Sequence, residues 1–126
     1  MAMHILKVRS HQREELVEFT DQVQRKLQES EAKEGIVVLY VQHTTAGLTV
    51  NENADPDVPR DMLHLLGTVI PQHGMGFRHG EENSDAHIKA TLVGSSVRFP
   101  AKRENSCWVV GREFFFASLT ARASAR

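Results

Sequence analysis

Cysteine is almost absent from this chain, because Cys107 is the only one in 126 residues. An internal disulfide is therefore excluded, and a lone cysteine is typical of proteins kept in a reducing cytoplasm, which is the location we predict. Long hydrophobic runs are missing as well. The sequence thus offers no membrane-spanning helix and no signal-peptide core, and we expect no membrane partner.

An excess of charge of one sign is also lacking, since the formal net charge is −1. Nucleic-acid binding usually needs a basic surface, so we expect no nucleic-acid partner. The composition, 40% hydrophobic and 25% charged, is that of an ordinary globular protein. A chain of this length can bury one hydrophobic core, and we predict a single domain over residues 1–126.

Short β-branched and apolar segments predict several strands. The apolar run Ile36–Val41 follows Gly35 and is expected to be a buried strand. Weaker alternation predicts a first strand at His4–Arg9. Three more strands are expected near the C-terminus, at Ser96–Pro100, Ser106–Val110 and Glu113–Thr120.

Helical periodicity predicts three helices between these strands. Apolar residues at helical spacing favour an amphipathic helix over residues 11–32. A second helix is expected to begin within residues 55–59 and to end before Pro71. The glycine-rich segment 71–84 is predicted to be a loop, followed by a short helix at Ala86–Val93. Strands that cluster with inserted helices indicate an α+β fold with a mixed, largely antiparallel sheet.

Residues 42–57, QHTTAGLTVNENADPD, follow the predicted central strand and are unusually rich in polar groups. Imidazole, hydroxyl, amide and carboxylate side chains presented by a rigid strand are typical of a functional site. The alternative is structural: Thr44 and Thr45 would be ordinary strand residues, and residues 53–57 would turn the chain and cap a helix.

Two long motifs, QHTTAGLTVNENADPDV and RHGEENSDAHIKATLVGSSVRFP, resemble those of the YjbQ-like family, often described as uncharacterised proteins or as secondary thiamine-phosphate synthases. The resemblance implies a largely antiparallel α+β sandwich with inserted helices and a homotrimer. It also implies a transferase that joins a thiazole phosphate to a pyrimidine pyrophosphate. This chain departs from the family near its last strand, where Gly111-Arg112-Glu113-Phe114 replaces the usual Gly-Thr-Trp-Gln.

Three histidines fall within the two motifs: His43, His79 and His87. Three neutral imidazoles with one open position form a common type of catalytic zinc site, so we predict a divalent metal such as zinc. The structural alternative makes His79 a loop residue and His87 a helix-face residue bonded to a carboxylate.

The family reaction assigns roles to further residues. His43 and Glu52 are the predicted catalytic groups, and the carboxylate of Glu52 would also suit magnesium bound with a phosphate substrate. Side chains that could hydrogen-bond the substrate are Thr44, Thr45, Asn51 and Asn83. Cations that could meet its phosphate are Arg78, Lys89 and Arg98.

Two other functions remain open from the sequence. A metal-dependent hydrolase could use the same histidines, with Glu52 as general base for a bound water. A trimeric protein that binds a metal or an anionic metabolite without catalysis would need only the binding groups.

Overall fold

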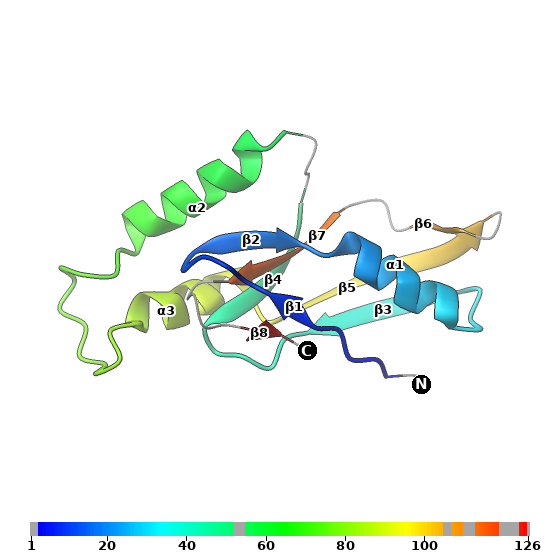
Figure 1. Ribbon diagram of the computed structural model, residues 1–126, viewed down its shortest axis with the longest axis horizontal. Coiled ribbons are helices and arrows are strands. Elements are labelled where there is room, and N and C mark those ends of the chain that lie inside the picture. The colour runs from blue at the N-terminus through cyan, green and yellow to red at the C-terminus, as the bar shows by residue number, and fades with distance from the viewer. Residues whose placement is uncertain (1–2, 52–54, 105–106, 110–112, 119–123, 126) are drawn as a thin grey trace.

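The fold is shown in Figure 1 as a computed structural model, which describes residues 3–51, 55–104, 107–109, 113–118 and 124–125. Its helices are α1 (Thr20–Glu29), α2 (Asp57–Val69) and α3 (Ser84–Val93). Its strands are β1 (Val8–Arg9), β2 (Glu15–Glu18), β3 (Glu34–Tyr40), β4 (Ala46–Asn51), β5 (Ser96–Glu104), β6 (Cys107–Val109), β7 (Glu113–Ser118) and β8 (Ser124–Ala125).

The strands form small antiparallel sheets. In one sheet β7 lies between β2 and β4, in a second β5 lies between β3 and β6, and β1 pairs with β8. Each pairing between described strands is antiparallel, which confirms the predicted α+β class with its antiparallel sheet. Because β7 fills the centre of its sheet, the N-terminal strand β2 is held by a strand from the far end of the chain.

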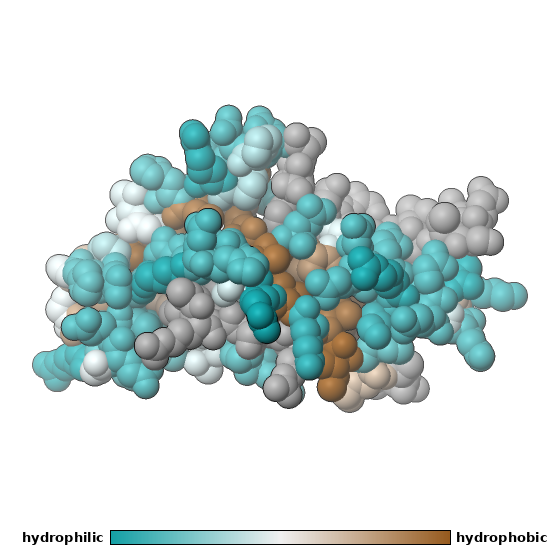
Figure 2. All heavy atoms as spheres, viewed as in Figure 1, coloured by the Kyte–Doolittle hydropathy of each residue, from teal (hydrophilic) through white to brown (hydrophobic). Residues whose placement is uncertain are grey.

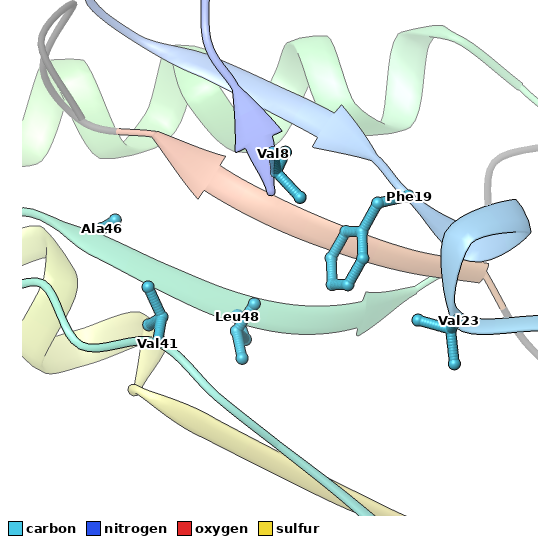
Figure 3. Close-up of a cluster of buried hydrophobic side chains, with 6 residues drawn as sticks. All are labelled: Val8, Phe19, Val23, Val41, Ala46 and Leu48. Carbon is cyan, nitrogen blue, oxygen red and sulfur yellow. The ribbon is translucent and has the colours of Figure 1, made fainter. Parts of the chain in front are cut away.

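The main hydrophobic core joins the sheets to α1. Its buried members are Val8, Phe19, Val23, Val41, Ala46 and Leu48, which Figure 3 draws together. Half-buried residues from β2, β3, β4 and β5 pack around them. The core therefore fixes the start of β4 and the end of β3 against each other, and this is where the polar 42–57 stretch begins.

The prediction of one helix over residues 11–32 is wrong at its N-terminal half. Residues 15–18 form β2, and α1 begins only at Thr20. Phe19 and Val23 enter the core as the periodicity predicts, but Leu16 pairs across the sheet with Ala117 of β7. Pairing with a distant strand outweighs a local helical pattern, because propensity is only a weak preference.

The central strand is present as β3, but it is not buried on both faces. Val37 and Leu39 turn inward, whereas Ile36, Val38 and Tyr40 are 76%, 63% and 61% exposed. An antiparallel sheet can leave one face uncovered, and β3 is an edge strand of its sheet. The protein chain by itself thus carries an apolar stripe on the outside of β3.

Helix α3 packs closely on β4 because Gly47 has no side chain. A Cβ atom at Gly47 would lie 2.8 Å from the carbonyl oxygen of Gly94 and 2.8 Å from Cγ1 of Val93. Gly94 ends the helix with a φ of 98°, which favours glycine. Its carbonyl then accepts a 2.9 Å hydrogen bond from the Leu48 N–H. The C-terminal end of α3 is therefore fixed to the sheet.

Helix α2 lies on the outside of β2 and buries none of its residues fully. Figure 2 shows hydrophobic residues at the surface beneath α2 on this face. The predicted loop follows, since residues 70–83 contain neither helix nor strand. Within the described residues, no helix combines the length and the apolar character that crossing a membrane requires.

Candidate functional site

The larger cavity lies between the end of β3 and α3 and has a volume of about 710 Å³. Its walls are partly apolar and also carry a phenol, an amide, hydroxyls and imidazoles. The residues whose side chains bring these groups are Tyr40, Gln42, His43, Thr44, His87, Thr91 and Ser95. It contains two of the three predicted metal-binding histidines.

Local structure explains why these groups meet. Val41 is 2% exposed, and its N–H donates a 2.9 Å hydrogen bond to the Ser95 carbonyl, so the chain is anchored just before His43. His87 and Thr91 are four residues apart on α3 and therefore share a face of the helix. The Thr91 hydroxyl also donates a 2.9 Å hydrogen bond to the His87 carbonyl, which fixes its orientation.

A second cavity, of about 450 Å³, lies between the 70–83 loop and the start of α3. Phe77, Arg78 and His79 line it from the loop, together with Ser84, His87 and Ile88 from α3. His87 contributes to the lining of both cavities. The two cavities therefore share one residue, and the second of them is also lined by an arginine.

The imidazoles of His79 and His87 meet edge to face, with ring centroids 5.4 Å apart. Nε2 of His79 also lies 3.7 Å from a carboxylate oxygen of Glu81. A metal site needs at least three His, Cys, Asp or Glu side chains close together. The described residues contain no such group. His43 shares a cavity with His87 but does not complete such a group, so the zinc site stays a prediction.

The predicted substrate-binding residues are dispersed. Thr44 lines the larger cavity, while Thr45 is half-buried and lines neither cavity. Asn51, at the end of β4, places its amide nitrogen 3.7 Å from the sulfur of Met62. Asn83 precedes α3 without capping it, and its buried side-chain oxygen has no hydrogen-bond partner among the residues that the structure describes. Glu52 lies outside the described residues.

Of the three predicted phosphate-binding cations, Arg78 lines the second cavity, and the other two occupy different environments. Arg98 is exposed on β5, across from Val38 of β3. Lys89 is 1% exposed, and its ammonium lies 2.7 Å from a carboxylate oxygen of Glu14 and 3.0 Å from one of Asp85. The charge of Lys89 is therefore already compensated inside the protein.

Asp85 is the centre of this buried charge network. It accepts hydrogen bonds from Arg13, at 2.8 Å, and from Lys89, at 3.0 Å, while its own side chain is fully buried. Burial alone raises the pKa of Asp85, but the hydrogen bonds and charges of Arg13 and Lys89 outweigh it, so the pKa is lowered from its ordinary 3.8. Asp85 is thus held as a carboxylate, and α3 is tied to the 13–14 segment.

Sequence reasoning missed several of the lining residues. Thr91 could have been found, because it follows His87 by one helical turn. Gln42 lies within the polar stretch but received no role, and Ser95 gives no local signal. The contacts of Arg13 and Glu14 with α3 join segments far apart in the chain, so no spacing rule predicts them.

The comparisons with known proteins identify the family. A model of the UPF0047 protein YjbQ-like family matches residues 4–111. This chain belongs to the YjbQ-like family. The family resemblance of the two sequence motifs is therefore confirmed. The match ends at Gly111, just before the Glu113-Phe114 pair that departs from the family's Trp-Gln.

Two relatives document the likeness at the sequence level. A UPF0047 protein of Methanocaldococcus jannaschii is 50% identical over 111 residues, covering 88% of this chain and 80% of the relative. The UPF0047 protein YugU of Bacillus subtilis is 43% identical over 91 residues, covering 72% of this chain and 69% of YugU. These names give the family and no reaction.

Solved structures of YjbQ-like proteins share the fold. One, from Clostridium acetobutylicum, has a TM-score of 0.88 at 35% identity. The match covers 98% of this chain and 95% of the Clostridium chain. A YjbQ-like protein of unknown function from Sulfolobus solfataricus has a TM-score of 0.85 at 27% identity. The match covers 97% of this chain and 89% of the Sulfolobus chain. The α+β architecture is therefore that of the family.

Proposed function

We propose that this YjbQ-like protein is an enzyme that binds a small phosphorylated metabolite between residues 42–44 and α3. The supporting observation is that His43 and His87, from two separate motifs, line one cavity of about 710 Å³. Ligand sites are commonly concave and carry a few convergent polar groups on a rigid frame. Here the frame is the end of β3 and the helix α3, both anchored by buried residues.

Thiamine-phosphate synthesis is the reaction that the family resemblance implies. The thiazole nitrogen attacks the pyrimidine methylene carbon, a C–N bond forms, and the C–O bond to pyrophosphate breaks with its electron pair leaving on pyrophosphate. Two small uncharged rings suit the hydroxyl, amide and imidazole groups around the larger cavity. A ring N–H of His87 would donate a hydrogen bond to the departing pyrophosphate. Glu52 keeps its predicted catalytic role.

A divalent metal belongs to the proposal because His79 and His87 lie side by side. The two imidazoles fit part of a zinc ligand set, and the remaining ligands would come from outside this pair. The metal would supply positive charge beside the leaving pyrophosphate.

Self-association is also part of the proposal. The apolar stripe of Ile36, Val38 and Tyr40 is exposed in one chain, and covering it with another copy would remove apolar surface from water. Tyr40 both belongs to this stripe and lines the larger cavity. A neighbouring subunit on β3 would therefore lie beside the site. The family resemblance implies three copies.

Rescue of a cell that lacks its main thiamine-phosphate synthase tests this function. We expect the wild type to restore growth without thiamine, and His43→Ala and Glu52→Gln to fail. His64→Ala is the matched control, because His64 is exposed on α2 and lines none of the cavities described. Equal rescue by every variant would show that this site is not the catalyst. Absence of rescue by well-expressed wild type would favour the metabolite-binding alternative.

A further inference from the structure

Arg78 is an exposed loop residue whose guanidinium has no carboxylate partner within the described part of the chain. None of the ion pairs between described residues includes it, whereas Arg13 and Arg60 are both paired with acids. Arg78 nevertheless lines the second cavity beside His79 and His87. An arginine that faces a cavity without an internal partner is available to bind an anion.

The two cavities differ in charge. No Lys, Arg, Asp or Glu is among the described residues that line the larger one. The second has Arg78 and the hydroxyl of Ser84, the first residue of α3, where the helix dipole is also positive. Glu81, whose carboxylate lies 3.7 Å from Nε2 of His79, is largely exposed. The charge of the lining residues therefore favours an anion in the second cavity and an uncharged group in the larger one.

The loop that carries Arg78 is closed at its base. The Gln72 side-chain nitrogen donates a 3.0 Å hydrogen bond to the Glu82 carbonyl, which joins the two ends of the loop. Gly74 and Gly76 both have positive φ, a backbone conformation that glycine adopts without strain. The loop thus has a defined path, and it places Arg78 in the wall of the cavity that His87 also lines.

We propose that the second cavity is the subsite for the phosphate or pyrophosphate end of the ligand. Arg78 binds that end, the uncharged ring lies in the larger cavity, and His87 stands between them. The inference rests on the proposed function, which supplies a phosphorylated metabolite at this site. It adds which cavity takes which part of the ligand, and it names Arg78 as the residue that selects for the anion.

Calorimetric titration of the full chain with pyrophosphate tests the subsite. The titration is run with EDTA, so that binding through a metal does not contribute. We expect Arg78→Gln to weaken pyrophosphate binding about tenfold or more, since a charge-assisted contact is lost. Arg25→Gln is the matched control, because Arg25 is an exposed arginine on α1, away from both cavities. The control should bind as the wild type does, and His43→Ala should weaken binding less than Arg78→Gln does.

Three outcomes would overturn the inference: no binding of pyrophosphate by the wild type at millimolar concentration, equal binding by Arg78→Gln, or loss of binding only in His43→Ala. The last result would place the anion in the larger cavity and leave the proposed function intact. The growth-rescue experiment tests the proposed function independently of this titration. Pyrophosphate that binds through Arg78 in a protein without rescue activity would support the subsite alone.

Discussion

The ammonium of Lys89 lies 3.0 Å from the carboxylate of Asp85, and both side chains are almost completely buried. The pair occupies successive turns of α3, the helix that presents His87 to both cavities. Glu14 and Arg13 complete the network from the other side. Its structural role is to hold α3, and so His87, against the N-terminal segment.

Removing Asp85 should strongly destabilise the fold. In Asp85→Ala, the buried ammonium of Lys89 keeps only the partly exposed carboxylate of Glu14 as a partner. Removing one member of a buried ion pair lowers the free energy of unfolding by about 3–5 kcal/mol. The measurement is the free energy of unfolding in urea. Glu29→Gln removes the exposed pair with Lys26 and should change that free energy by no more than about 0.5 kcal/mol. Equal effects of the two variants would contradict this role for Asp85.

The same carboxylate should make stability depend on pH in the acid range. The folded protein holds Asp85 at a pKa below its ordinary 3.8, so the unfolded chain binds the proton more readily. The stabilisation is complete above the ordinary value and is lost as the pH falls through the lower, folded value. The free energy of unfolding in urea should therefore fall less between about pH 6 and about pH 3 in Asp85→Asn than in wild type. Parallel pH profiles would contradict this assignment.

Much of the fold was predictable because local signals agreed with the tertiary structure. Gly35 and the apolar run after it marked β3, and Pro71 and Gly94 marked the ends of α2 and α3. The helix over 11–32 failed at Leu16, where pairing with β7 decides the conformation. The exposure of Ile36 was also missed, because periodicity cannot tell a covered face from an open one.

The site was predictable only in part. His79 and His87 lie in one motif, and the structure brings their rings together. Lys89 was predicted to meet phosphate, yet it is buried against Glu14 and Asp85. Its burial depends on a contact with a segment near the N-terminus, and the sequence around Lys89 carries no sign of that contact.

Zinc binding provides a test of the histidine pair. We expect His87→Ala and His79→Ala each to lower zinc affinity at least about tenfold, because each removes a proposed ligand. Competition against a chromogenic chelator measures the affinity. His64→Ala should bind zinc as the wild type does. If neither variant at the pair changes the affinity, the two imidazoles are not ligands.

Assembly should depend on the outer face of β3. Light scattering should give three times the mass of one chain for the wild type at micromolar concentration. Ile36→Lys should shift that mass toward the monomer, because a charge would be buried in the contact. Ile5→Lys is the control, since Ile5 is 65% exposed but lies outside β3. A monomeric wild type would contradict self-association.

The rate of thiamine-phosphate formation by purified protein tests the central claim most directly. The substrates are the thiazole phosphate and the pyrimidine pyrophosphate, and the quantity is kcat/KM for wild type, His87→Ala and His64→Ala. The account predicts product from the wild type and from His64→Ala at similar rates. It predicts a loss of at least about a hundredfold in His87→Ala, the contribution typical of a positioned catalytic side chain. Wild-type rates in His87→Ala, or no product from the wild type, would contradict it.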